Sequence, residues 1–190
     1  MITHVIWDLG DTLITPPNGG QDLQPLDQCM EVHLRPGAQG ILRKVSELGY
    51  VQAILSNTAT SDSRTVRRLL TRLCVENYFE FIYATQSELS HDKPEKPDPM
   101  VFDIVLDALG ILPEQSVMVG NSWDNDVLGA NRSGMHACWL VNQSVSVRKN
   151  VTSRVESPPF VIPVYDIADV PDALQLLRSA VTIRSNEEIR

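Results

Sequence analysis

The chain has 190 residues, of which 43% are hydrophobic and 21% are charged, and its net charge at pH 7 is −8. This size and composition are typical of one globular domain with a hydrophobic core. The negative charge argues against a nucleic-acid backbone or an anionic membrane surface as a partner. The short basic run at Arg67, Arg68 and Arg72 is interpreted as a solvated helix face.

No stretch approaches the roughly 18 uninterrupted apolar residues of a membrane-spanning helix, so we expect no membrane association. The three cysteines, Cys29, Cys74 and Cys138, are scattered and fit neither a metal-binding spacing nor a disulfide framework. A cytoplasmic location, where thiols stay reduced, is therefore expected.

Short apolar runs that end in turn residues alternate along the chain with segments of helical periodicity. The expected strands are Val5–Trp7, Val51–Leu55, Phe81–Ala84, Val117–Val119, Ala137–Leu140 and Phe160–Val164. Because both faces of these runs are apolar, they suit a parallel sheet that is covered by helices on both sides.

Helices are expected between the strands, and most have recognisable start or stop signals. Their expected starts are Pro36, Ser61 or Asp62, Asp98 with Pro99, about Trp123, and Pro171. Gly49, Gly110 and Gly134 are the expected stops of the first, third and fourth. This alternation predicts an α/β fold, a doubly wound parallel sheet with right-handed crossovers.

Two segments interrupt the alternation. Residues 14–35 are rich in Pro, Gly, Asn and Gln, and residues 143–159 are similarly polar and irregular. We predict a single domain over residues 1–183, in which 14–35 form an irregular flap, followed by a frayed tail at 184–190.

Polar side chains follow the ends of several expected strands, which is where an open parallel sheet binds its ligands. They are Asp8, Gly10, Asp11 and Thr12 after the first strand, Ser56 and Asn57 after the second, Asn121, Ser122, Asp124 and Asp126 after the fourth, and Lys96 in the loop before the third helix. Taken singly, most of them are ordinary turn, cap or loop residues. Together they provide carboxylates for Mg²⁺, a lysine for phosphoryl oxygens and a hydroxyl for another oxygen, as phosphoryl transfer requires.

These segments resemble the four motifs of the haloacid dehalogenase-like (HAD) superfamily of hydrolases. Residues 8–12 read DLGDT against the family's Asp-x-Asp-x-Thr, and residues 54–57, ILSN, resemble the strand that ends in Ser or Thr. Residues 96–99, KPDP, resemble the lysine motif, and residues 120–126, GNSWDND, resemble the acidic fourth motif. The resemblance runs from about residue 3 to 178 and is strongest to the small capless phosphatases (subfamily IIIA).

The resemblance implies that Asp8 attacks phosphorus and forms an aspartyl-phosphate that water hydrolyses. It also implies that Ser56, Asn57 and Lys96 bind the phosphoryl group. The implied Mg²⁺ ligands are Asp8, the carbonyl of Gly10, Asn121 and Asp126, with Asp124 as a weaker candidate. The expected substrate is a phosphorylated small molecule or a bulky phosphorylated substrate.

Two positions depart from the family pattern. The usual acid/base aspartate, two residues after the nucleophile, is Gly10, and the first acid of the fourth motif is Asn121. The loss of a general acid/base costs roughly 10²–10⁴-fold where a proton must move, so acyl phosphates should suffer less than alkyl phosphates. Asp11 either takes over that role or only braces the turn, with Gly10 permitting an unusual backbone.

The gaps from Asp8 to Ser56 and from Ser56 to Lys96 are each filled by a helix and a strand. Neither gap can hold a separate cap domain, so we expect an open site. Such a site suits a bulky substrate, or a partner subunit that completes the pocket, and the oligomeric state stays open.

Two other functions remain as alternatives. A catalytically silent protein that binds a phosphorylated ligand shares every feature except turnover, because Gly10 lacks the acid. A metal-independent dehalogenase also lacks the second aspartate, but this branch of the family relies on a cap for which the chain has no room.

Overall fold

The computed structural model describes residues 1–17, 23–90, 92–141 and 158–187. Six parallel strands form one sheet in the order β3-β2-β1-β4-β5-β6. They are β1 (His4–Trp7), β2 (Val51–Ser56), β3 (Phe81–Ala84), β4 (Ser116–Gly120), β5 (His136–Leu140) and β6 (Val161–Val164). All the segments expected to be strands are strands, and the doubly wound parallel sheet is confirmed.

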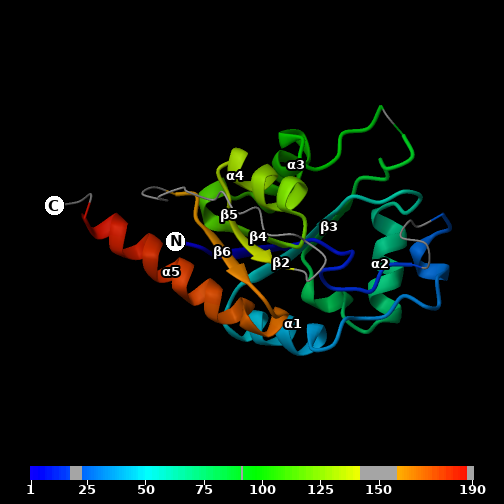
Figure 1. Cartoon of the computed structure of the whole chain (residues 1–190), viewed down its shortest axis with the longest axis horizontal. Coiled ribbons are helices and arrows are strands. Elements are labelled where there is room, and N and C mark those ends of the chain that lie inside the picture. Colours follow the sequence, from blue (N-terminus) through cyan, green and yellow to red (C-terminus); the bar gives the residue numbers. More distant parts are fainter. Residues whose placement is uncertain (18–22, 91, 142–157, 188–190) are drawn as a thin grey trace.

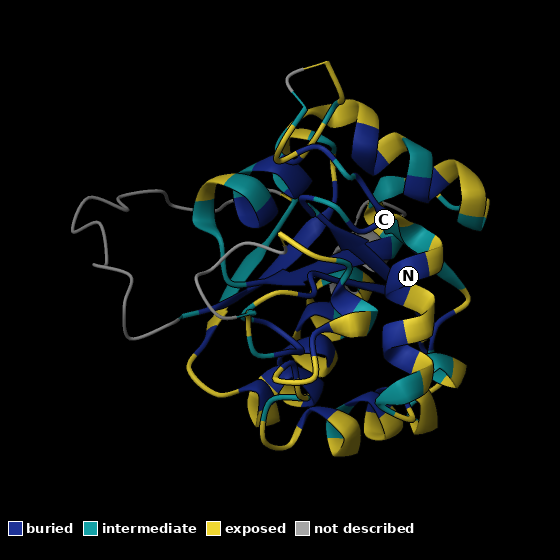
Figure 2. Cartoon of the chain, turned by 90° about the vertical axis from the view of Figure 1, so that its right-hand side faces the viewer, coloured by how far each residue is buried: buried dark blue, intermediate teal, exposed yellow. Residues whose placement is uncertain are grey.

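Helices cover both faces of this sheet (Figure 1). They are α1 (Ala38–Glu47), α2 (Ser63–Arg72), α3 (Pro99–Leu109), α4 (Gly129–Arg132) and α5 (Val170–Glu187). Helices α1, α2 and α5 contribute buried side chains to one hydrophobic cluster, and α3 and α4 contribute to a second cluster. Figure 2 shows the buried sheet between helices whose outer faces are exposed. No separate cap domain occurs within the described ranges.

Strand β1 divides its side chains between the two clusters. Val5 and Trp7 pack on the side of α1, α2 and α5, whereas Ile6 packs on the side of α3 and α4. Each is fully buried, and burying such a side chain contributes about 1.5–3 kcal/mol. The indole N–H of Trp7 donates to Gln52 Oε1 at 3.0 Å, so its polar atom is also satisfied. The core therefore fixes the central strand, and with it the chain end where Asp8 lies.

Helix ends follow the expected signals with small shifts. Asp62 caps α2 by accepting from the Thr65 backbone N–H at 2.8 Å, and Asp98 caps α3 in the same way. Helix α1 begins at Ala38 rather than at Pro36, because Gly37 precedes it in a left-handed conformation with φ 83°. Helix α5 continues to Glu187, past the expected end of the domain at residue 183. None of the described helices is long and apolar enough to span a membrane.

The burial of Cys138 predicts how the stability of the protein changes at alkaline pH. It is fully buried in β5, and this burial raises the pKa of its thiol from about 9 to about 12. Above about pH 9 the unfolded chain loses the thiol proton while the folded state keeps it. The contribution of this thiol to the free energy of unfolding is therefore fully present below about pH 9 and is lost as the pH rises toward 12.

Between about pH 9 and 12 we expect the free energy of unfolding to fall by up to about 1.4 kcal/mol per pH unit through this thiol. Urea denaturation of the wild type and of Cys138→Ala at pH 7.5, 9 and 10.5 measures the difference in slope, which removes the contributions of other titrating groups. Parallel pH profiles for the two proteins would contradict the prediction.

Candidate active site

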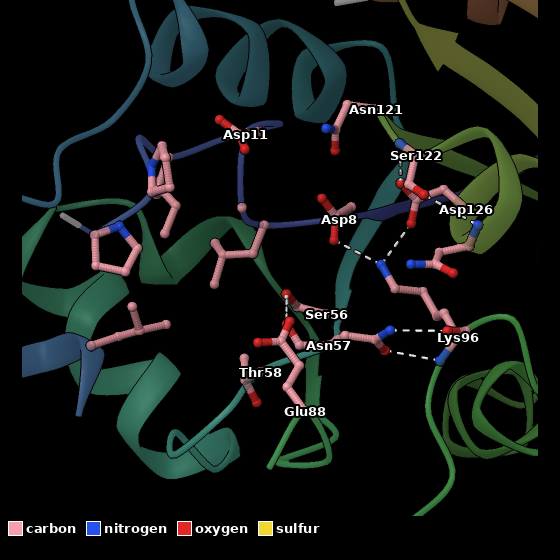
Figure 3. Close-up of a pocket in the computed structure, with 17 residues that line it drawn as sticks. Asp8, Asp11, Ser56, Asn57, Thr58, Glu88, Lys96, Asn121, Ser122 and Asp126 are labelled. Carbon is pink, nitrogen blue, oxygen red and sulfur yellow. Dashed lines mark hydrogen bonds and ion pairs between the residues drawn. The ribbon is translucent and has the colours of Figure 1, made fainter. Parts of the chain in front are cut away.

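Asp8 stands at the carboxyl end of the central strand β1. Its backbone N–H donates to the carbonyl of Val119 in β4 at 2.9 Å, and the residue is 7% exposed. A cavity of about 330 Å³ opens beside it, lined from the ends of β1, β2 and β4 and from the following loops. Figure 3 shows this cavity with Asp8, Ser56, Lys96, Asn121 and Asp126 around it. The sheet edge thus brings together the residues that the motifs singled out.

Lys96 joins the two buried carboxylates of the site. Its Nζ lies 2.7 Å from Asp8 Oδ1, 2.6 Å from Asp126 Oδ1 and 3.0 Å from the carbonyl oxygen of Leu55. These acceptors use all the protons of an ammonium group. The side chains of Lys96 and Asp126 are almost completely buried. Lys96 therefore lies deep in the site, not in solvent as an isolated loop lysine would.

The charges of this cluster determine its protonation. Burial alone would lower the pKa of Lys96, but the negative charges of Asp126 and Asp8 outweigh burial and raise it. Burial raises the pKa of Asp126 to about 6; Lys96 opposes this rise and Asp8 adds to it. At neutral pH the lysine is charged, and the cluster of two carboxylates and one ammonium has a net negative charge.

Removing the ammonium would leave two carboxylates buried side by side. We expect Lys96→Met to lower the free energy of unfolding by about 3–5 kcal/mol at pH 7 in EDTA, since an unpaired buried charge is strongly destabilising. Urea denaturation measures this, and Lys93→Met is the matched control, because Lys93 is an exposed lysine of the same loop. Equal stability of the two variants would show that Lys96 does not hold the carboxylates together.

Thr12 contacts the other oxygen of the Asp8 carboxylate. Its hydroxyl lies 2.9 Å from Asp8 Oδ2 and 3.2 Å from Asn121 Oδ1. The hydroxyl has one proton for these two acceptors, so it links Asp8 to the fourth motif. The backbone carbonyl of Asn121 accepts from the indole N–H of Trp139 at 3.2 Å. Asn121 is thereby held beside Asp8, where the resemblance places a metal ligand.

Asp126 is positioned by an unusual helical turn. The expected helix from Trp123 begins as a π-helix, Trp123–Leu128, and only then continues as α4. The backbone N–H of Ser122 donates to Asp126 Oδ2 at 2.8 Å. A side chain at Gly120 would place its Cβ 2.2 Å from the same oxygen, so this close approach requires glycine. Single-turn π segments are frequent at functional sites.

Asp124 has no part in the cavity. It is exposed and does not line the cavity, whereas Asn125 does. The expectation of Asp124 as a weaker metal-ligand candidate is therefore wrong. The π-helical turn changes which side chains face the cavity. A prediction based on a regular α-helical period therefore did not include Asn125.

Ser56 and Asn57 end β2 on the opposite side of Asp8. Ser56 is 3% exposed and lines the cavity, and its hydroxyl donates to the Asn57 carbonyl at 3.2 Å. The Asn57 side chain accepts from the Lys96 backbone N–H at 2.9 Å and donates to the Lys96 carbonyl at 3.0 Å. Asn57 therefore holds the lysine in place. A direct contact of either residue with substrate stays a prediction.

Asp11 has a left-handed backbone, with φ 56°. The unusual conformation expected at Gly10 thus falls on Asp11 itself, a residue type that tolerates it. The Asp11 carbonyl accepts a hydrogen bond from the Arg35 guanidinium, and its carboxylate has no hydrogen-bond partner among the described residues. In Figure 3 this carboxylate points away from Asp8 and Lys96. Its role in proton transfer stays a prediction.

Gly10 leaves open space where the family has its acid/base residue. A Cβ placed on Gly10 would meet no atom within 4 Å, and Gly10 lines the cavity. The loop therefore has room for a side chain at this position.

The segment 14–35 is anchored to α2 through its described part. Arg68 pairs with Asp27, and Arg72 donates to the carbonyl of Cys29 at 2.9 Å. Arg67 and Arg68 are exposed, as expected of a solvated helix face, whereas Arg72 is only partly exposed and contacts the segment. The anchored segment contributes an apolar wall to the cavity, made by Ile14, Pro16, Pro17 and Leu26.

Several lining residues had no assigned role in the sequence. Thr12 was part of a motif, but Thr58 and Glu88 come from loops and Leu26 from a short 3-10 helix, Leu26–Gln28, none of which carries a recognisable signal. Residues 18–22 and 142–157, which include most of the second irregular segment, lie outside the described residues.

The oxygen donors of the site fit Mg²⁺. Among the described residues no group of three His, Cys, Asp or Glu side chains could hold a metal ion. The cavity is instead lined by two carboxylate residues, Asp8 and Asp126, and by Asn121 and Gly10, where the resemblance places an amide and a backbone carbonyl ligand. Mg²⁺ prefers oxygen ligands and is commonly held by one or two carboxylates together with waters and substrate phosphate.

Comparison with known proteins supports the same family. The family model described as haloacid dehalogenase-like hydrolase matches residues 24–140, and the chain belongs to this family. Haloacid dehalogenase-like hydrolase domain-containing protein 3 of Xenopus laevis is 30% identical over 134 residues, which cover 68% of this chain and 51% of that protein. Glyceraldehyde 3-phosphate phosphatase of Methanothermobacter thermautotrophicus is 33% identical over 111 residues, covering 58% and 46%. The chain thus spans about half the length of these curated relatives.

Two solved structures extend the comparison. An uncharacterised protein from Listeria monocytogenes serotype 4b is 53% identical, with a TM-score of 0.87 and coverage of 94% of this chain and 99% of that one. A HAD phosphatase from Thermococcus onnurineus has a TM-score of 0.67 at 16% identity, covering 91% and 98%. At that identity the second structure supports the fold alone.

Proposed function

We propose that this protein is a Mg²⁺-dependent phosphohydrolase that acts on a phosphorylated small molecule through an aspartyl-phosphate on Asp8. One observation carries the proposal: the buried Asp8 carboxylate lies at a cavity between the Lys96 ammonium and the Thr12 hydroxyl. Curated relatives named glyceraldehyde 3-phosphate phosphatase and phosphoserine phosphatase support this reaction class.

The residues around Asp8 prepare it as a nucleophile. Lys96 and Thr12 each bind one oxygen of its carboxylate, which fixes the orientation of the group before substrate arrives. Ser56 at the end of β2 lines the same cavity, and its hydroxyl could donate to a phosphoryl oxygen by turning away from the Asn57 carbonyl. Attack by an Asp8 oxygen on phosphorus forms the acyl phosphate and breaks the bond to the leaving group.

The charge of the cluster explains the need for a cation. Asp8, Asp126 and Lys96 together carry a net negative charge, which would repel a phosphate dianion. The donors Asp8, Asp126, Asn121 and the Gly10 carbonyl would hold Mg²⁺, which when bound neutralises charge on the phosphoryl oxygens.

The open space at Gly10 shapes the expected substrate range. No side chain at that position can protonate a leaving group, and the Asp11 carboxylate points away from Asp8. Acyl phosphates, whose leaving group departs without a proton, should therefore be hydrolysed faster than alkyl phosphates. The same observation favours a second candidate, a protein that binds a phosphorylated ligand without turnover.

Hydrolysis of acetyl phosphate and of a panel of alkyl phosphates, each with Mg²⁺ and with EDTA, tests the proposal. We expect release of phosphate from acetyl phosphate with Mg²⁺ and none with EDTA. Mg²⁺-dependent binding of vanadate without hydrolysis of any compound would support the silent binding protein.

A further inference from the structure

The outer part of the cavity has two chemically different sides. Ile14, Pro16, Pro17 and Leu26 form an apolar wall on one side. The other side, formed by the loops after β2 and β3, carries Thr58 and Glu88, and Figure 3 shows both near Ser56. Asp11 lines the cavity as well, on the loop after β1. A leaving group that extends outward from phosphorus would lie among these residues.

Positive charge is scarce in this cavity. Among the described residues that line it, Lys96 is the only one with a cationic side chain. The protons of Lys96 are directed at Asp8, Asp126 and the carbonyl of Leu55, so its ammonium cannot also bind a distant anionic group. Asp11 and Glu88 add negative charge to the outer part. A second anionic group on a substrate would find no described cation there.

We propose that the cavity selects phosphorylated substrates whose leaving group carries no negative charge, and that an ammonium group on it is favoured. This inference rests on the proposed function, because it concerns the leaving group of the same reaction. The apolar wall accommodates an alkyl chain, and the carboxylates of Asp11 and Glu88 attract a positive charge and repel a negative one.

Phosphonates test the preference without any turnover. In 4-aminobutylphosphonate, butylphosphonate and 4-phosphonobutanoate a methylene replaces the ester oxygen, so the compounds differ mainly in the charge at the far end of the chain. Binding to the unmodified protein with Mg²⁺ is measured by isothermal titration calorimetry. We expect the ammonium compound to bind about tenfold more tightly than the carboxylate compound, with the neutral compound between them.

Reversing the charge of one cavity residue tests whether the cavity causes the preference for the ammonium compound. Glu88→Lys is expected to abolish or reverse the order of affinities. Glu80→Lys is the matched control, because it changes the net charge equally but is exposed before β3, at the opposite end of the strand from the cavity. The control should keep the order of the wild type.

The outcomes separate this inference from the proposed function. Equal affinities, a preference for the carboxylate compound, or no Mg²⁺-dependent binding of any of the compounds would overturn the inference. The same order in Glu88→Lys as in Glu80→Lys would also overturn it. Because the phosphonates cannot be hydrolysed, the expected order together with no hydrolysis of acetyl phosphate would reject the proposed activity and leave the charge preference standing.

Discussion

Replacement of Asp8 by asparagine is expected to abolish the hydrolysis of acetyl phosphate. An amide cannot attack phosphorus, so no aspartyl-phosphate can form, and the expected loss exceeds that of any other single substitution in the site. Release of inorganic phosphate with saturating Mg²⁺ measures the effect. Asp124→Asn is the matched control, because Asp124 is exposed and does not line the cavity. The control should retain wild-type activity.

The Asp8→Asn variant should keep its free energy of unfolding, whereas Lys96→Met is expected to lose stability. Removal of the Asp8 charge leaves one buried carboxylate, Asp126, paired with one ammonium, Lys96. It also removes one cause of the raised pKa of Asp126, so the remaining pair should stay ionised at neutral pH. Urea denaturation should show stability close to that of the wild type. A folded Asp8→Asn protein with near-normal turnover would place the nucleophile elsewhere.

The sequence predicted which side chains meet, because parallel strands end at the same edge of a sheet. Asp8, Ser56 and Asn121 each follow a strand whose apolar residues are easy to recognise, and the structure brings all of them to one cavity. Lys96 was found through its motif. The parallel order of the strands therefore carried most of the prediction of the site.

Local backbone geometry and long-range contacts could not be predicted in this way. The left-handed conformation of Asp11 accompanies a hydrogen bond to its carbonyl from Arg35, which is distant in sequence. The π-helical turn decides that Asn125 lines the cavity and that Asp124 does not. Asn57 was expected to bind substrate, yet its amide is bound on both sides to the backbone of Lys96. Each of these features depends on a partner that periodicity does not reveal.

The second large effect is expected at Gly10, the position where the resemblance places an acid/base aspartate. Gly10→Asp is expected to raise the hydrolysis of alkyl phosphates by about 10²-fold or more, at the low end of what a general acid contributes. The new side chain has room, because a Cβ at Gly10 meets no atom within 4 Å. Acetyl phosphate should be hydrolysed at nearly the wild-type rate, since its leaving group needs no proton.

Gly10→Asn is the matched control, because asparagine has the size of aspartate but cannot transfer a proton. A gain in Gly10→Asp that Gly10→Asn shares would mean that the side chain acts by reshaping the loop.

Asp11→Asn in the wild-type background tests whether Asp11 has taken over proton transfer. If it has, alkyl phosphates should slow by roughly 10²–10⁴-fold while acetyl phosphate is spared. The orientation of its carboxylate in Figure 3 favours the other result, an equal and small loss on both substrates, because the bound carbonyl of Asp11 braces the loop that carries Asp8. A selective loss on alkyl phosphates, with no gain from Gly10→Asp, would show that Asp11 moves inward during the reaction.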